Sequence, residues 1–240
     1  MPRVTPAERI IVALDRSRPE DILGLAHSLA GRVGFFKIGL QAFVANGPSI
    51  VRDVASAGVR VFLDLKLHDI PNTVAKTTSE VRNLGASLLT IHAAGAGPMI
   101  RAAAEVDGRP RLLAVTMLTS LGDDDIRAIG LAGNASENAV RLARLSQESG
   151  ADGVVASPQE IRIIREACGP GFLIVTPGIR GPGDAKGDQR RTMTAAEAIA
   201  AGADYLVIGR PITDAGDPVA AVDEILSTLQ RLEDTTINGL

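Results

Sequence analysis

The 240-residue sequence is poor in cysteine and in aromatic residues. It contains one cysteine, one tyrosine, five phenylalanines and no tryptophan. A single cysteine excludes an intramolecular disulfide and a cysteine-rich metal site. With so few aromatic side chains, a base-stacking surface for single-stranded nucleic acid is not expected. The net charge of −3 and an isoelectric point near 5.7 likewise give no basic surface for nucleic acid.

Long apolar runs are also missing. No stretch approaches the roughly 18 apolar residues of a membrane span. The apolar core of the segment 1–15 is too short for a signal peptide. We therefore expect a cytoplasmic protein without a membrane partner. The composition, 45% apolar and 22% charged, is that of an ordinary globular protein.

Lysine is scarce among the basic residues. Lysine and arginine together number 25, and the lysines are only Lys37, Lys66, Lys76 and Lys186. The chain thus uses arginine where it needs generic positive charge. A lysine inside an apolar strand therefore suggests a specific chemical role.

Short apolar segments alternate with helical segments along the whole chain. This alternation predicts a parallel sheet, and eight repeats in this length match the closed (β/α)8 barrel of about 250 residues. An open doubly wound sheet is the alternative, but no G-x-G-x-x-G follows the first strand. We expect an α/β fold, a single-domain (β/α)8 TIM barrel over residues 1–240. The predicted strands are 10–15, 34–39, 59–66, 88–92, 111–118, 153–157, 172–177 and 205–210.

The predicted helices have legible start and stop signals. Ser157-Pro158-Gln159-Glu160 and Thr194-Ala195-Ala196-Glu197 both have the form of a capping box, and Asp217-Pro218 opens the last helix. Four glycines precede predicted strands and are expected to end helices in the left-handed conformation. These are Gly58, Gly85, Gly150 and Gly202.

The third predicted strand carries an unusual pattern in the stretch 61–73, "VFLDLKLHDIPNT". Leucines at 63, 65 and 67 alternate with Asp64, Lys66 and His68, which is the period of a strand. In a barrel the leucine face packs under the helices. Asp64 and Lys66 then point inward near the carboxyl end of the strand, where such barrels carry their active sites.

Two more charged residues share this inward register. Asp15 ends the first predicted strand, and Lys37 lies near the end of the second. A cluster of ion pairs that only orders the core is the alternative. Such clusters stabilise less than hydrophobic packing does, and barrel interiors are normally apolar. We therefore interpret the four charges as a candidate active site.

Some polar residues near this motif have an ordinary explanation as well. Asp69 precedes Ile70-Pro71 and could be the N-cap of the third helix, and Thr73 has the same ambiguity. No nucleophile motif such as G-x-S-x-G accompanies the three histidines, which therefore do not indicate a catalytic triad. The histidines are His27, His68 and His92.

Glycine-rich segments follow the last two strands and suggest a phosphate site. They are 176–183, "TPGIRGPG", and 208–213, "IGRPIT", and the loops after strands seven and eight often bind phosphate in these barrels. Gly209 lets backbone N–H groups approach an oxyanion, and Arg210 can add a bidentate contact. We expect lid loops around 119–136 and 180–191, although an ordinary mobile loop remains the alternative.

The motifs together resemble those of bacterial orotidine 5'-phosphate decarboxylases. The resemblance runs from "IVALD" to Thr213 and is most specific in "DLKLHDIPNT", with "TPGIR" and "IGRPIT" in the same order. It implies conversion of orotidine 5'-phosphate to uridine 5'-phosphate and CO2, the last step of de novo pyrimidine synthesis. It implies no metal and no organic cofactor.

The resemblance also implies roles for individual residues. Lys66 would protonate C6 of the pyrimidine, and Asp64 would lie beside the substrate carboxylate. Lys37, Asp64, Lys66 and Asp69 would form an alternating charge network. Asp69 and Thr73 would come from the neighbouring subunit, which implies a homodimer. The implied substrate-binding set is Asp15, Lys37, Asp64, Asp69, Ile70, Thr73, Thr119, Pro177, Arg180, Gln189, Gly209 and Arg210.

Three other functions fit part of the pattern. A sister decarboxylase acting on 3-keto-gulonate 6-phosphate shares the Asp-x-Lys-x-x-Asp motif, but it uses Mg²⁺ and has an acidic residue in place of Lys37. A Schiff-base aldolase would need a neutral amine at Lys66, whereas neighbouring aspartates favour the charged form. A non-catalytic nucleotide-binding or structural barrel would bind uridine 5'-phosphate without turnover.

Overall fold

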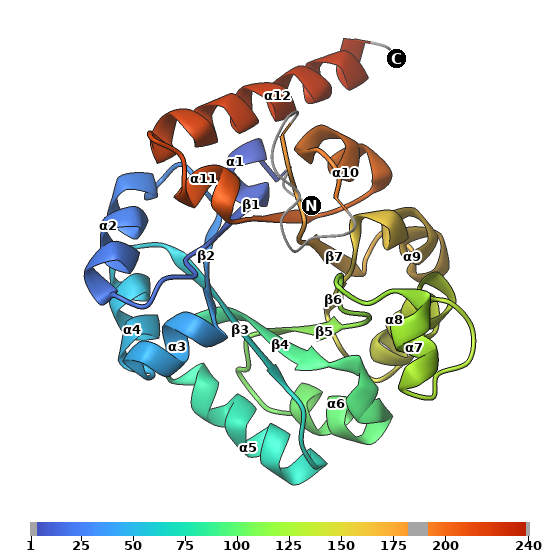
Figure 1. Cartoon of the computed structure of the whole chain (residues 1–240). Coiled ribbons are helices and arrows are strands. Elements are labelled where there is room, and N and C mark those ends of the chain that lie inside the picture. Colours follow the sequence, from blue (N-terminus) through green and yellow to red (C-terminus); the bar gives the residue numbers. More distant parts are fainter. Residues whose placement is uncertain (1–3, 182–191, 239–240) are drawn as a thin grey trace.

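The computed structural model describes residues 4–181 and 192–238, which form a closed barrel of eight parallel strands (Figure 1). Each strand pairs with the next along the chain, and β1 pairs with β8 to close the ring. The predicted (β/α)8 barrel is therefore confirmed. The strands are β1 Ile10–Ala13, β2 Phe35–Gly39, β3 Arg60–Leu67, β4 Ala86–His92, β5 Arg111–Val115, β6 Gly153–Val155, β7 Leu173–Thr176 and β8 Tyr205–Ile208.

Most strands end earlier than the sequence predicts. β5 stops at Val115 rather than at residue 118, and Met117 and Leu118 line a pocket instead. β4 instead begins two residues before the predicted start, at Ala86. The ends of strands are set by pairing with neighbours, which a local pattern does not contain.

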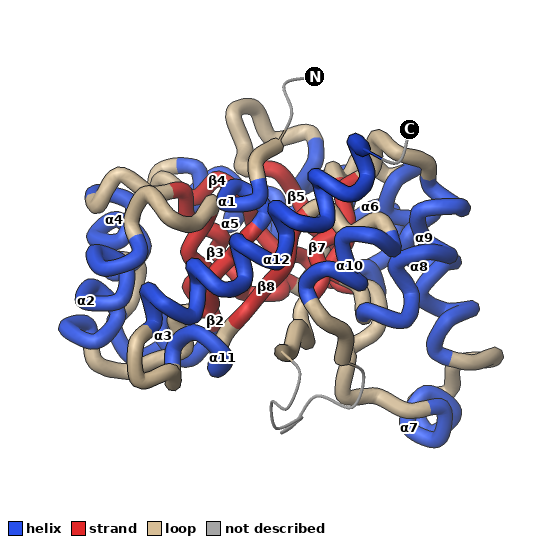
Figure 2. Tube along the Cα trace, turned by 90° about the horizontal axis from the view of Figure 1, so that it is seen from above, coloured by secondary structure: helices blue, strands red, loops and turns tan. Residues whose placement is uncertain are grey.

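The longer helices surround the ring of strands (Figure 1). In the side view, α1 lies at one end of the barrel, and α7 and α11 lie at the other (Figure 2). Within residues 4–181 and 192–238, no helix is long and apolar enough to cross a membrane. The helices are α1 Pro6–Arg9, α2 Pro19–Leu29, α3 Leu40–Asn46, α4 Ser49–Ser56, α5 Pro71–Arg82, η1 Ala93–Gly95, α6 Ala96–Ala104, α7 Asp123–Ala128, α8 Ala135–Glu148, η2 Pro158–Glu160, α9 Ile161–Cys168, α10 Ala195–Ala201, α11 Arg210–Thr213 and α12 Pro218–Asn238.

The start and stop signals predicted for the helices have the expected contacts and backbone conformations in the structure. Thr194 Oγ1 accepts the Glu197 N–H at 3.3 Å and the Glu197 carboxylate accepts the Thr194 N–H at 2.9 Å, a reciprocal capping box. At 158–160 the first turn is a 3-10 helix, and Glu160 accepts the Ser157 N–H at 3.1 Å. Asp217 caps α12 by accepting two backbone N–H groups. The four expected glycines have positive φ, at 79°, 81°, 91° and 110° for Gly58, Gly85, Gly150 and Gly202.

Apolar side chains form two layers, one on each face of the sheet. One layer lies between the strands and the helices, and Leu63 belongs to it while Leu65 and Leu67 pack against it. The other layer fills the inside of the barrel. Period-two alternation thus works as predicted. The inner layer consists of Ile11, Ala13, Phe35, Phe62, Leu88, Leu113, Val175, Tyr205 and Val207.

Two Asp–Arg locks hold the amino-terminal end of the barrel. Asp152, just before β6, accepts the Leu112 N–H at 2.7 Å and pairs with Arg109 at 2.5 Å. Asp204, just before β8, accepts the Ile174 N–H at 2.7 Å and pairs with Arg165 at 2.6 Å. Each carboxylate therefore links the start of one strand to the backbone of the preceding strand. We call these pairs the amino-end locks.

Candidate functional site

A pocket of about 720 Å³ opens at the carboxyl ends of the strands. Its floor is the inner apolar layer, and its rim is built from the segments that follow the strands, which is where barrels of this type place their chemistry. The described lining residues are Ala13, Asp15, Arg16, Lys37, Gln41, Phe62, Asp64, Lys66, Val115, Met117, Leu118, Thr119, Val155, Ala156, Pro177, Gly178, Arg180, Val207, Gly209, Arg210, Thr213 and Asp214.

Four charged side chains of alternating sign meet in this pocket. Lys37 Nζ donates to Asp15 Oδ1 at 2.9 Å and lies 3.6 Å from Asp64 Oδ2. Lys66 Nζ donates to Asp64 Oδ1 at 2.8 Å. The side chains of Lys37 and Asp64 are 10% and 13% exposed, and that of Lys66 is 31% exposed. The predicted convergence of these four residues is confirmed. The network has two exposed ends, Lys66 and Asp15, and the Asp15 side chain is 51% exposed.

A glycine makes room for the first of these pairs. A Cβ at Gly39, the last residue of β2, would lie 2.8 Å from both Asp15 Oδ1 and Lys37 Nζ. The carboxylate and the ammonium therefore occupy space that any larger residue at position 39 would take. The Asp15–Lys37 contact depends on this glycine.

Asp64 and Lys66 lie on a bulge in β3. Pairing runs from Leu63↔Leu89 to Leu67↔Ile91, so β3 advances four residues while β4 advances two. Lys66 has φ of 53°, in the left-handed region that costs a non-glycine residue about 1–2 kcal/mol. Bulges re-aim side chains next to active sites, and this one directs the Lys66 side chain over Asp64.

The environment of Asp64 stabilises its ionised form. Burial by itself raises the pKa of this carboxyl group. The nearby ammonium groups of Lys37 and Lys66 outweigh burial, and hydrogen bonds from Lys66 and Thr90 add to their effect. The pKa of Asp64 therefore lies below its ordinary value, and the carboxylate is charged at neutral pH.

The segments after β7 and β8 carry the residues predicted to bind phosphate. Pro177 and Arg180 come from the segment after β7, and Gly209 and Arg210 come from the segment after β8. The Arg180 backbone N–H donates to the Met193 carbonyl at 3.0 Å, which fixes the position of the Arg180 backbone. Thr119 also lines the pocket, as predicted. Gln189 lies outside the described residues.

Three predicted residues do not line this pocket within one chain. Asp69, Ile70 and Thr73 are exposed at the start of α5, and Ile70 is 65% exposed. The N-cap of α5 is Ile70, not Asp69, and Asp69 Oδ1 accepts the Ile70 N–H at 2.6 Å. The N-cap explanation of Asp69 is therefore wrong. Its predicted place in a neighbouring subunit's site stays a prediction.

The structure adds residues that the sequence did not single out. Arg16 lines the pocket directly after Asp15, and its Nη2 donates to the Thr213 carbonyl at 2.8 Å and to Asp214. Thr90, fully buried, contacts both Asp64 and the Lys66 backbone. Its inward register with Leu88 was visible in the sequence. No local sequence pattern indicates the contact of Arg16 with Thr213 and Asp214, which joins the segment after β1 to the segment after β8.

In the part of the chain that the structure describes, the contacts of the histidines do not indicate a catalytic triad. His27 is exposed on α2, far from the strand ends. The rings of His68 and His92 stack with centroids 5.3 Å apart. Burial, then the proximity of His68 and Lys66, lowers the pKa of His92, so its imidazole is neutral at pH 7. Packing beside β3 is the role that these contacts support.

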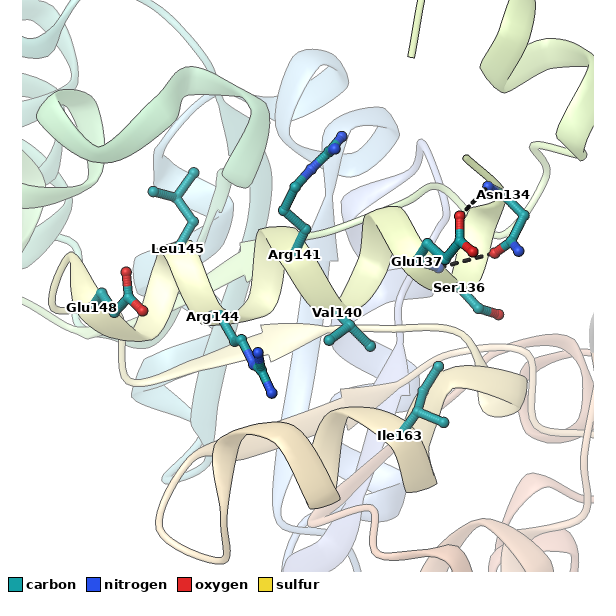
Figure 3. A pocket seen from close by; sticks show the side chains of 9 residues that line it. All are labelled: Asn134, Ser136, Glu137, Val140, Arg141, Arg144, Leu145, Glu148 and Ile163. Atoms are coloured by element: carbon teal, nitrogen blue, oxygen red, sulfur yellow. Dashed lines mark hydrogen bonds between the residues drawn. The ribbon is translucent and has the colours of Figure 1, made fainter. Parts of the chain in front are cut away.

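A second hollow, of about 710 Å³, lies outside the barrel between α8 and α9 (Figure 3). The bonds drawn there join Asn134 and Glu137 at the start of α8, which is a helix cap. The hollow is therefore explained by helix packing and capping. Throughout 4–181 and 192–238, no group of three His, Cys, Asp or Glu side chains is placed to hold a metal ion.

Comparison with known proteins gives one consistent result. The family model described as "Orotidine 5'-phosphate decarboxylase / HUMPS family" matches residues 8–225. A protein of Geobacter sulfurreducens named orotidine 5'-phosphate decarboxylase is 49% identical over 95% of this chain and 99% of its own length. The protein of the same name from Anaeromyxobacter dehalogenans is 51% identical over 93% of this chain and 99% of its own.

Solved structures agree with the sequence relatives. The crystal structure of orotidine 5'-phosphate decarboxylase from Lactobacillus acidophilus superposes with a TM-score of 0.80 and 38% identity. The match covers 92% of this chain and 98% of the other. The similarity therefore extends over most of the chain.

Proposed function

Because the chain belongs to the orotidine 5'-phosphate decarboxylase / HUMPS family of enzymes, we propose that it converts orotidine 5'-phosphate to uridine 5'-phosphate and CO2. This is the last step of de novo pyrimidine synthesis. The observation that carries the proposal is the Lys66 ammonium, held 2.8 Å from Asp64 inside a pocket that Arg180 and Arg210 also line. One end of the pocket suits a carbon acid and the other a phosphate.

The proposed reaction needs no cofactor. The bond between C6 and the carboxyl carbon breaks, CO2 leaves, and the electron pair stays on C6. The ammonium of Lys66 stabilises this charge electrostatically and then transfers a proton to C6. The new C6–H bond completes uridine 5'-phosphate, and the neutral amine takes a proton from water. Enzymes lower barriers by about 8–23 kcal/mol, and this reaction needs the upper part of that range.

Asp64 has two roles in this proposal. Its carboxylate fixes the position of the Lys66 ammonium through the 2.8 Å hydrogen bond. It also lies where the substrate carboxylate would enter, so that repulsion favours loss of CO2. Both roles require the charged form, and the lowered pKa of Asp64 provides it.

The remaining residues hold the substrate. Asp15 and Lys37 would bind the ribose, Thr119 the base, and Arg180, Gly209 and Arg210 the phosphate, with Pro177 alongside. Gln189 is proposed as a further phosphate contact and lies outside the described residues. Binding energy from the phosphate, far from C6, would position the base and exclude water. The segment 119–136 is proposed as one lid.

The proposal includes a homodimer. Asp69, Ile70 and Thr73 are exposed and are not among the residues that line their own chain's pocket, as is expected of residues that complete a neighbour's site. Asp69 would then be the fourth member of the charge network. A cytoplasmic location is proposed with it.

The sister activity on 3-keto-gulonate 6-phosphate fits this site less well. That chemistry needs Mg²⁺, which prefers oxygen ligands. Here the Lys37 ammonium lies between Asp15 and Asp64, at 2.9 Å and 3.6 Å, and repels a divalent cation. A Schiff-base aldolase is disfavoured in the same way, because Asp64 at 2.8 Å favours a charged Lys66.

The test is to add orotidine 5'-phosphate to protein treated with a chelator and to follow the ultraviolet absorbance of the pyrimidine. We expect turnover that is unaffected by the chelator. Binding of uridine 5'-phosphate without turnover would support a non-catalytic barrel instead. Mg²⁺-dependent turnover of 3-keto-gulonate 6-phosphate alone would assign the sister activity. Trapping of a sugar phosphate by borohydride would assign the aldolase.

A further inference from the structure

We infer that Thr90 is a positioning residue, whose hydroxyl sets the geometry of Lys66 and Asp64 for the reaction. Thr90 lies on β4, has no exposed surface, and does not line the pocket. It therefore acts through its neighbours and touches no substrate. This inference rests on the proposed function, because it concerns the residue that delivers the proton.

The bulge in β3 creates the need for such a residue. Asp64, Leu65 and Lys66 lie between the paired residues Leu63 and Leu67, and on β4 only Thr90 lies between their partners. The regular ladder of backbone bonds is therefore interrupted here. The Lys66 N–H donates to Thr90 Oγ1 at 2.9 Å, which replaces the missing backbone acceptor.

The direction of the two hydrogen bonds follows from chemistry. A backbone N–H can only donate, so Thr90 Oγ1 accepts from Lys66. An ionised carboxylate can only accept, so the Thr90 O–H donates to Asp64 Oδ1 at 3.0 Å. The hydroxyl thus uses its proton and a lone pair at once. It has one orientation that satisfies both partners.

The contacts close a ring around the proton donor. Lys66 is held at its backbone by Thr90 and at its Nζ by Asp64 Oδ1, and Thr90 holds that same oxygen. The strained φ of 53° at Lys66 is one member of this ring. Loss of the hydroxyl would release the Lys66 backbone and leave Asp64 Oδ1 with the ammonium alone.

The test compares Thr90→Val, which keeps the shape and removes the hydroxyl, with Thr90→Ser, which keeps the hydroxyl. We expect kcat for orotidine 5'-phosphate to fall about 10- to 100-fold in Thr90→Val, as for loss of a hydrogen bond to a charged group. Thr90→Ser should recover most of that loss. Affinity for uridine 5'-phosphate should change less than about two-fold, since Thr90 does not line the pocket.

A pH profile distinguishes positioning from packing. The hydrogen bond from Thr90 lowers the pKa of Asp64, so Thr90→Val should move the acid limb of kcat toward higher pH. Carbon-13 NMR of the Asp64 carboxylate gives the same pKa without catalysis. Thr176→Val is the matched control. Thr176 is a fully buried barrel threonine on β7 whose hydroxyl has no partner in the described chain, and its loss should change neither readout.

Each possible outcome either supports or overturns the inference about Thr90. Equal losses in Thr90→Val and Thr90→Ser, or no shift of the acid limb, would overturn the inference while leaving the proposed function in place. Absence of turnover by the wild-type protein would instead reject the proposed function, and the NMR titration would still test the placement of Asp64. Should Thr90→Val not fold, Thr90→Cys, similar in size and a poor hydrogen-bonding group, takes its place with the same expectations.

Discussion

Lys66 Nζ donates a 2.8 Å hydrogen bond to Asp64 Oδ1, although the two residues stand two positions apart on the same strand. In a regular strand such neighbours stand about 6–7 Å apart along one face. The bulge in β3 and the left-handed backbone of Lys66 bring the ammonium back over the carboxylate. The pair is therefore placed by strand geometry and not by a loop, which favours a fixed distance between the two groups.

Replacing Lys66 with alanine should abolish decarboxylation. Proton donation contributes about 10²- to 10⁴-fold and electrostatic stabilisation a further 10²- to 10³-fold. We therefore expect kcat/KM to fall by at least about 10⁴-fold, with circular dichroism and affinity for uridine 5'-phosphate largely retained. Lys76→Ala, on the exposed face of α5, is the matched control and should leave kcat/KM unchanged. Near-normal turnover in Lys66→Ala would remove its assigned role.

Mixing two inactive variants should restore activity if Asp69 completes a neighbour's site. Lys66→Ala and Asp69→Ala dimers that exchange subunits would form hybrids with one intact site each. Random exchange gives about a quarter of the wild-type activity, measured after verified exchange. Lys66→Ala mixed with Lys37→Ala is the control. Both lysines lie in one chain's pocket, so no intact site forms. No recovery in the first mixture would place Asp69 outside the shared site.

Arg210→Ala should act through the phosphate. A charge-assisted hydrogen bond to phosphate contributes about 1.5–3 kcal/mol, so kcat/KM for orotidine 5'-phosphate should fall roughly 10- to 100-fold. Decarboxylation of orotidine, which lacks the phosphate, should be unaffected. Arg231→Ala on the exposed side of α12 is the control. Equal losses on both substrates would show that Arg210 does not bind the phosphate.

The pH dependence of stability should report Asp64. The pKa of Asp64 is lower in the folded chain than the ordinary 3.8, so between the folded and the unfolded pKa the unfolded chain binds more protons. The stabilisation from ionised Asp64 is therefore complete above the unfolded pKa and is lost as the pH falls from there through the folded pKa. Urea unfolding of wild type and Asp64→Asn should show a gap in unfolding free energy that narrows as the pH falls below about 4. A constant gap would contradict the lowered pKa.

Asp204→Ala should lower stability without changing the chemistry. Asp204 accepts the Ile174 N–H and pairs with Arg165 at the amino-terminal end of the barrel. Its loss should cost about 1–3 kcal/mol in urea unfolding. The kcat/KM of the folded protein should stay within about two-fold of wild type. A large loss of kcat in protein shown to be folded would mean that the lock is coupled to the pocket.

The sequence was sufficient to predict the barrel and the convergence of four charges. Period-two alternation placed Leu63 outside and Asp64 inside, and parallel strands bring their carboxyl ends to one rim. Both features are local and repeat along the chain. The glycines after the helices were predicted for the same reason, since each conformation is set by its own residue.

Features that depend on pairing between strands could not be predicted. The bulge in β3 exists only relative to β4, so neither the left-handed Lys66 nor the two contacts of Thr90 follow from the motif itself. The helix α7 within the segment 119–136, whose first turn holds three successive aspartates, was not foreseen. Asp69 belongs to the motif, but β3 ends at Leu67, so Asp69 lies beyond the strand and is not placed by its alternation.

The amino-end locks have a consequence for how this barrel can change over evolutionary time. Asp152, Arg109, Asp204 and Arg165 have no member among the residues that line the pocket. Mutations that alter substrate preference at the carboxyl end of the barrel can then accumulate without weakening the amino-end locks. A family that includes enzymes of different specificity is what such separation would permit.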